Sequence, residues 1–99
     1  MLSSKQRAYL RGLANKENAI FQIGKGGLTD EILKELDIVL EKRELIKITV
    51  LETAFMTTRG ACEAICEEIG AEPVQCIGNQ VVIYRMARAK DNRKIELPK

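Results

Sequence analysis

The stretch AIFQIGKGGLTDEILKELDIVLEKRELIKITVL, residues 19–51, predicts a strand, a glycine-rich turn, a helix and a second strand in succession. Residues 19–23 are short, apolar and rich in β-formers, and Gly24 ends the run. Residues 45–51 are partly alternating and β-branched, as in a second strand. Strands separated by helices favour a mixed sheet with right-handed crossovers.

The helix between these strands has the clearest signals in the chain. Thr29 is a candidate N-cap, followed by the acidic residues Asp30 and Glu31 in the first turn. An apolar repeat then marks the buried side: Ile32, Leu33, Leu36, Val39 and Leu40. Asp37 and Glu41 are expected on the far side.

The remaining elements follow the same kind of signal. Residues 4–14 predict a first helix after serine caps, and residues 58–69 predict a third helix that ends at a glycine. Gly78-Asn79 predicts a hairpin between two further strands. The expected fold is α/β, a compact mixed four-stranded sheet with three helices in the order α-β-α-β-α-β-β. Residues 1–86 are expected to form one domain and residues 87–99 a basic tail, whose Ile95 and Leu97 are able to dock on the body.

Length and composition restrict the class of protein. Ninety-nine residues suffice for one domain, and nothing approaches the roughly 20-residue apolar stretch of a membrane helix. The N-terminal residues lack the apolar core of a secretory signal, so the cytoplasm is the expected compartment. Three cysteines, Cys62, Cys66 and Cys76, are then expected to be reduced thiols with no zinc site, because the chain has no histidine.

Charge is segregated along the chain. Residues 1–27 and 73–99 each carry a net charge of +4, whereas residues 28–44 carry −3 and residues 61–72 carry −4. If folding brings the termini together, one side of the domain is basic and suits a polyanionic partner.

The GKGG sequence at residues 24–27 is the strongest candidate site. Glycines remove the Cβ and tolerate positive φ, so successive amides can point at one anion, and Lys25 adds a full charge. The helix that begins near Thr29 supplies further unpaired N–H groups. This combination predicts a phosphate cradle. The alternative is a tight turn that needs glycine only for its geometry.

Other known motifs fit less well. The spacing breaks both the dinucleotide fingerprint and the P-loop, while G-x-x-G at Gly24 to Gly27 matches the loop with which KH domains clamp a nucleic-acid backbone. Without histidine, common nucleophile and base pairs cannot be built, so the sequence does not predict an enzyme. No cofactor, metal or small-molecule substrate is expected. Of the four aromatic residues, Phe21 and Tyr84 are expected in the core or sheet, which leaves base stacking little support.

Several segments in the same order resemble the CRM domain (chloroplast RNA splicing and ribosome maturation) in its single-domain bacterial, YhbY-like form. They are SSKQRAYLRGLA, QIGKGGLT, ELIKITV, IGNQVVIYR and the tail RKIELPK. The resemblance implies a fold like the C-terminal domain of bacterial initiation factor three. It also implies RNA binding through the GxxG loop and adjoining basic surface, and a role in ribosome biogenesis with precursors of the large subunit.

The resemblance and the chemistry together give a set of candidate RNA-binding residues. The set comprises the loop, the basic first helix, Arg59 and Arg85: Gly24, Lys25, Gly26, Gly27, Lys5, Arg7, Arg11, Arg59 and Arg85. A solvated basic face is the alternative for the first helix, and pairing with a nearby acid is the alternative for Arg59.

A second hypothesis comes from the acidic segments. The outer faces of the second and third helices carry Asp37, Glu41, Glu63 and Glu67, which could dock a basic partner such as a ribosomal or assembly protein. In that case the chain is a protein-interaction module.

Overall fold

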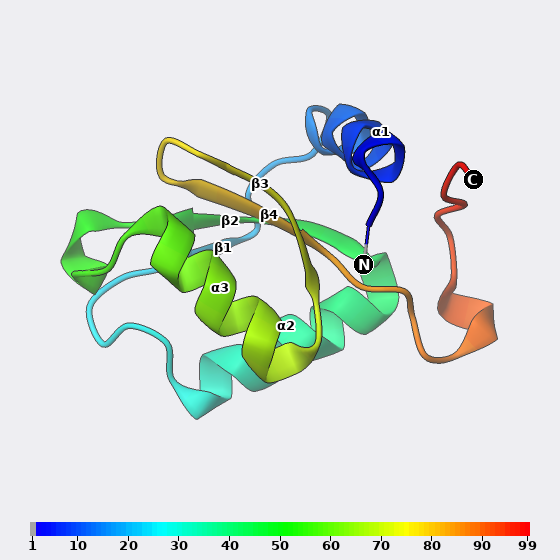
Figure 1. The fold of residues 1–99 in the computed structure, drawn as a ribbon. Coiled ribbons are helices and arrows are strands. Elements are labelled where there is room, and N and C mark those ends of the chain that lie inside the picture. The colour runs from blue at the N-terminus through cyan, green and yellow to red at the C-terminus, as the bar shows by residue number, and fades with distance from the viewer. Residues whose placement is uncertain (1) are drawn as a thin grey trace.

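The computed structural model describes residues 2–99, which form a four-stranded sheet between helices (Figure 1). The helices are α1 (Ser4–Ala14), α2 (Asp30–Arg43) and α3 (Thr58–Ile69). The strands are β1 (Phe21–Ile23), β2 (Leu45–Val50), β3 (Glu72–Ile77) and β4 (Gln80–Tyr84), and two short 3-10 turns are η1 (Glu52–Ala54) and η2 (Lys90–Asn92). The predicted α/β class and order of elements are confirmed.

The sheet is mixed, in the order β1-β2-β4-β3. β1 pairs with β2 in parallel, as the strand-helix-strand stretch predicts, and the other two pairings are antiparallel. β1 is shorter than expected, because it begins at Phe21 rather than residue 19. The predicted hairpin joins β3 to β4, with Gly78 at a φ of 57° in its turn.

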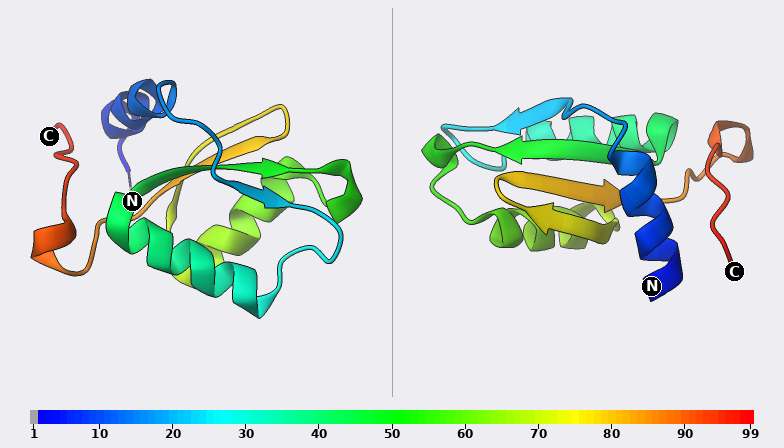
Figure 2. Two further views of the ribbon diagram at one scale, coloured as in Figure 1. Left: turned by 180° about the vertical axis from the view of Figure 1, so that it is seen from behind. Right: turned by 90° about the horizontal axis from the view of Figure 1, so that it is seen from above.

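Strand alternation divides the apolar residues between two clusters, one on each face of the sheet. The helices α2 and α3 cover one face, where Leu36, Leu40 and Ile65 pack on Ile48 and Ile83. On the opposite face, α1 packs on a smaller cluster that consists of Leu2, Leu10, Ala14, Leu45, Val74, Val82 and Tyr84. Figure 2 (right) shows α1 crossing one end of the strands, so the rest of that face carries no helix.

Each helix begins at the residue that the sequence marks. Ser3 and Gln6 form a capping box at α1, and the Thr29 hydroxyl accepts the N–H of Ile32 at α2. At α3 the Thr57 hydroxyl accepts the N–H of Gly60. Among residues 2–99, no helix has the length and apolar character needed to cross a membrane.

The C-terminal tail lies against the body of the domain. Ile95 and Leu97 pack on the α1-side cluster, as the sequence suggests. The carboxylate of Glu44, which is 0% exposed, accepts the N–H groups of Ala87, Lys94 and Ile95 at 2.8, 2.7 and 2.9 Å. Burial alone would raise the pKa of Glu44, but these donors and the charge of Arg93 outweigh it and lower the pKa.

Candidate nucleic-acid interface

The GKGG sequence forms a tight turn between β1 and α2. The N–H of Gly27 donates to the carbonyl of Gly24 at 2.9 Å, which closes a four-residue turn with Lys25 and Gly26 at its tip. Gly26 has a φ of 101° and Gly27 a φ of 64°. Such a turn requires positive φ at its third residue, which glycine adopts without steric cost.

Glycine at position 24 is favoured for a different reason. A Cβ at this position would lie 3.2 Å from the Thr53 hydroxyl and 3.3 Å from a methyl group of Leu51. The turn therefore rests closely on the segment that follows β2. The N–H of Leu51 also donates to the Ile23 carbonyl at 2.8 Å, which fixes the two segments to each other.

The donors that the turn offers to an anion are fewer than expected. The N–H of Gly27 is used inside the turn, and the N–H of Ile32 is capped by Thr29. The amides of Lys25 and Gly26 donate to no group within residues 2–99, and both residues are exposed. Asp30 and Glu31, at the start of α2, would oppose a second negative charge. Within the turn itself, the cradle thus consists of two amides and the Lys25 ammonium, and the N–H groups of Asp30 and Glu31 in the first turn of α2 also donate to no group within residues 2–99.

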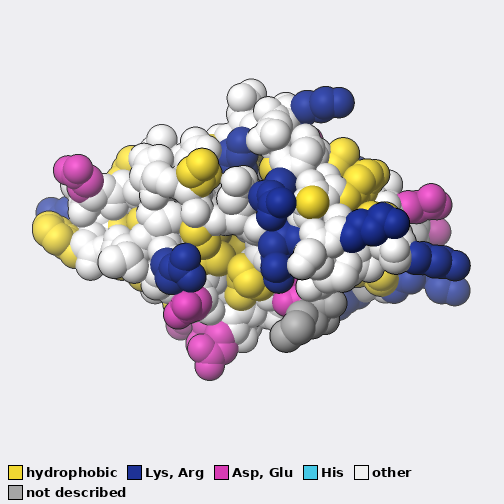
Figure 3. Space-filling model, turned by 45° about the horizontal axis from the view of Figure 1, so that its top comes forward, with side chains coloured by type: hydrophobic (Ala, Val, Ile, Leu, Met, Phe, Trp, Pro, Cys, Tyr) yellow, Lys and Arg dark blue, Asp and Glu magenta, His cyan; other side chains and the backbone are white. Residues whose placement is uncertain are grey.

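The basic residues of α1 lie on the partly open face of the sheet. Lys5 is exposed, whereas Arg7 and Arg11 are half-buried. Arg7 shares a hollow of about 170 Å³ with Arg59 of α3, and the floor of the hollow is formed by the edge strand β3. Folding therefore brings Arg59 beside the basic helix. Figure 3 shows this face, with Lys and Arg side chains gathered on it and most acidic side chains near its margins.

A row of polar side chains connects the GKGG turn with α1. In the sheet register Gln22 pairs with Thr49, and Thr49 pairs with Gln80. Lys47 lies one pleat further along β2, opposite Val82, on the same face as α1. We call Gln22, Lys47, Thr49 and Gln80 the open sheet face. The sequence signal for this surface is the alternation in β2, which directs Lys47 and Thr49 to the face of the sheet away from the buried Ile46 and Ile48.

Arg85 does not belong to this surface, contrary to the sequence-based expectation. It is 8% exposed, and its guanidinium lies 3.0 Å from an Asp37 carboxylate oxygen and 3.3 Å from one of Glu41. It also donates to the Asp37 carbonyl. Arg85 directly follows β4, and its side chain meets the acids on α2. Arg85 connects elements of the domain and is not accessible to RNA.

The same contacts occupy two of the acids expected to dock a partner. Glu41 accepts the side-chain amide of Asn92 and the N–H groups of Ala89 and Arg88, and these bonds lower its pKa from 4.5 to about 2. Asp37 also pairs with Arg88 at 3.3 Å. Asp37 and Glu41 are therefore paired with Arg85 and with the chain's own tail.

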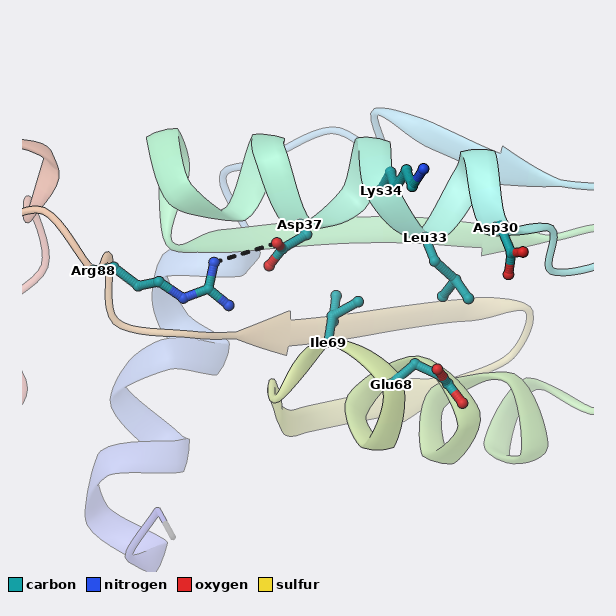
Figure 4. Close-up of a pocket in the computed structure, with 7 residues that line it drawn as sticks. All are labelled: Asp30, Leu33, Lys34, Asp37, Glu68, Ile69 and Arg88. Atoms are coloured by element: carbon teal, nitrogen blue, oxygen red, sulfur yellow. Dashed lines mark hydrogen bonds and ion pairs between the residues drawn. The ribbon is translucent and has the colours of Figure 1, made fainter.

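A hollow of about 320 Å³ lies between α2 and α3 (Figure 4). Arg88 reaches toward it from the tail and pairs with Asp37, while Glu68 and Ile69 enter it from α3. The charged residues that line this hollow are of both signs.

The three cysteines form no disulfide: Cys62 is buried, Cys66 half-buried and Cys76 exposed. Residues 2–99 contain no cluster of ligands able to hold a metal ion.

Comparison with known proteins agrees with this architecture. The pattern of the CRS1 / YhbY (CRM) domain matches residues 2–85. YqeI of Bacillus subtilis, named a probable RNA-binding protein, is 41% identical over 99% of this chain and 100% of its own length. A protein of Haemophilus influenzae named RNA-binding protein is 38% identical over 99% of this chain and 96% of its own. The solution structure of a hypothetical protein of Staphylococcus aureus matches with a TM-score of 0.75 and 42% identity, over 99% of this chain and 100% of the other.

Proposed function

The chain belongs to the CRS1 / YhbY (CRM) domain family, and from that premise we propose that it is an RNA-binding protein. The GKGG turn holds the phosphodiester backbone. The observation that carries the proposal is the pair of unused, exposed amides at Lys25 and Gly26 beside the Lys25 charge. Phosphate oxygens accept such bonds readily, and the bare turn lets them approach closely.

The RNA contact extends along the face that bears α1. From the GKGG turn, the RNA backbone runs over the open sheet face toward Lys5, Arg7 and Arg11 of α1. Arg59 adds positive charge at the β3 edge of this surface. This surface offers charge and shape along one side of the domain and few groups that read base edges. Structured RNA is therefore the expected target.

The target that we propose is ribosomal RNA of the large subunit or its precursors, and the function is to assist ribosome assembly in the cytoplasm. The resemblance of the whole chain to the YhbY-like proteins supports this choice. The names of the relatives support RNA as the partner and are no more specific than that.

The test is a salt titration of binding to transcripts of large-subunit ribosomal RNA, measured by fluorescence anisotropy. Lys25→Ala should weaken binding at every salt concentration and reduce the slope of log affinity against log salt by about one, because one phosphate contact is lost. An Arg7→Ala and Arg11→Ala double variant should reduce the slope by about two.

Lys34→Ala is the matched control. Lys34 is exposed on α2 and lines the hollow between α2 and α3, on the opposite face of the sheet from α1. This variant should bind RNA as the parent does, although it loses the same charge as Lys25→Ala. If Lys25→Ala and the double arginine variant both keep the parental affinity and slope, the assignment of the interface is wrong.

A second candidate function is supported by the exposed acids of α3. Glu63 and Glu67 are both exposed and lie one turn apart on the helix, where a basic ribosomal or assembly protein could dock. Reversing both charges to lysine should then abolish association with large-subunit particles while binding to naked RNA remains. Unchanged association would exclude this role.

A further inference from the structure

Phe55 follows η1 and is unusual in both exposure and backbone conformation. Its side chain is 93% exposed, the highest value among the exposed large hydrophobic residues of the described chain. Its φ is 53° and its ψ 39°, so it lies in the left-handed region. Bulky residues rarely adopt this conformation, and strained positions of this kind concentrate at functional sites.

The conformation of Phe55 is held by its neighbours on both sides. Its N–H donates to the Glu52 carbonyl at 3.1 Å, and the N–H of Ala54 donates to the Leu51 carbonyl at 3.0 Å. Ala54 and Met56 both pack against the larger core cluster. With its two neighbours turned inward and anchored, the ring of Phe55 is presented to solvent from a fixed backbone.

This turn lies directly beside the GKGG turn. Leu51 and Thr53 are the residues on which Gly24 rests, at 3.3 and 3.2 Å from the position of a Cβ. Figures 1 and 2 show η1 and the loop from β1 to α2 side by side at the same end of the molecule in every view. In Figure 3, hydrophobic and basic side-chain atoms project next to each other at that end.

We propose that Phe55 stacks on an unpaired base of the nucleotide strand whose phosphate lies in the GKGG turn. The inference rests on the proposed function of that turn and narrows its target. The face of an aromatic ring can stack on any base that is not already stacked in a helix. The preferred RNA is therefore a loop, bulge or single-stranded end. Scattered exposed hydrophobic residues are common, but here an anchored, strained aromatic adjoins the phosphate cradle.

Glu52 places a negative charge in the same turn as Phe55. It is exposed in the same turn, so its carboxylate opposes an approaching phosphate. Attraction between charges alone therefore favours the neighbouring basic surface over this end. A strand held here depends on the unused amides, Lys25 and the stacking surface together.

The experiment compares two RNA probes of equal length, a short polyuridylate strand and a blunt-ended duplex. Base stacking on an aromatic side chain is lost in Phe55→Ala, which should weaken binding to the strand by about 5- to 100-fold and binding to the duplex by less than about 2-fold. The salt slope should not change, because no charge is removed. Phe55→Tyr should bind the strand as the parent does.

Phe55→Leu is the matched control, since it keeps an apolar side chain but has no aromatic face. It should lose affinity for the strand as Phe55→Ala does. The chain contains no tryptophan, so Phe55→Trp provides a single tryptophan, at the site, which can be excited selectively over the two tyrosines. Its emission should be quenched when polyuridylate binds and should change little with the duplex.

The possible outcomes separate this inference from the function on which it rests. If Lys25→Ala weakens binding to both probes while Phe55→Ala changes neither, the turn binds RNA and the stacking role is rejected. If Phe55→Leu binds the strand as tightly as the parent, the contact is merely hydrophobic and the proposal is likewise overturned. If the parent binds neither probe nor ribosomal RNA, both proposals fail. Circular dichroism melts should show that all Phe55 variants remain folded, because the side chain is exposed.

Discussion

Replacing Glu44 by alanine should detach the C-terminal tail and lower the free energy of unfolding by about 3 kcal/mol. Glu44 is fully buried, and its carboxylate accepts three N–H groups from residues 87–95 of the tail. Each hydrogen bond to a charged group contributes about 1.5–3 kcal/mol after desolvation is included. Bonds that share one carboxylate are not additive, so the expected loss of about 3 kcal/mol is that of one to two such bonds.

The loss should be visible in two independent measurements. Because 1 kcal/mol shifts Tm by about 4–8 °C in a domain of this size, Tm should fall by about 12–24 °C. Urea unfolding followed by circular dichroism gives the free energy directly. Limited trypsin digestion reports on the tail, whose cleavage sites Arg88, Lys90, Arg93 and Lys94 should become accessible well below the unfolding midpoint.

The left-handed backbone of Glu44 destabilises the domain, whereas its side chain stabilises it, and this difference provides a control. The φ of Glu44 is 66° at the end of α2, a position where glycine is usual. Glu44→Gly loses the same three hydrogen bonds but relieves the left-handed strain, so it should be more stable than Glu44→Ala by about 1 kcal/mol. Glu67→Ala, at an exposed acid on α3, should leave stability unchanged.

A Glu44→Ala variant that unfolds at the parental urea concentration and keeps its tail protected from trypsin would refute this role of Glu44. That result would mean that the three hydrogen bonds are replaced by water without cost. Equal stability of the alanine and glycine variants would refute only the part that concerns backbone strain.

The pKa of Glu41 is lowered from 4.5 to about 2, and that of Glu44 is also lowered. The stability that these two carboxylates contribute is therefore complete above about pH 5 and is lost as the pH falls toward 2. Urea midpoints measured at about pH 7, 4 and 2.5 should decrease in that order. Phe55→Gly should raise the free energy of unfolding by about 1 kcal/mol, because the left-handed backbone strain disappears and no buried contact is lost; an unchanged urea midpoint would contradict this. Arg85→Ala should destabilise the domain by about 3 kcal/mol, because Asp37 and Glu41 both lose their ion pair with the buried guanidinium. At a temperature where the variant stays folded, the salt slope of its RNA binding should equal that of the parent; a reduced slope would place Arg85 in the interface.

Most of the secondary structure follows from signals within a few residues of each element. Thr29 caps α2, Gly78 turns the hairpin, and alternation in β2 separates the two faces of the sheet. These features depend on local hydrogen bonds, positive φ and hydrophobic period. All of them are properties that a short stretch carries without reference to the rest of the chain. The positions of Gly24 to Gly27 at the end of a strand belong to the same class.

The roles of individual polar groups depend on partners far along the chain. Arg85 pairs with Asp37 across 48 positions, and Glu44 binds the tail across about as many. The placement of the segment that contains η1 against Gly24 is likewise set by contacts between residues far apart in the sequence. Sequence period and composition constrain which residues face inward, whereas availability of a charge or an amide depends on what the folded chain brings against it. For that reason the location of the candidate site could be inferred from residue order, and its actual donors and cations only from the tertiary contacts.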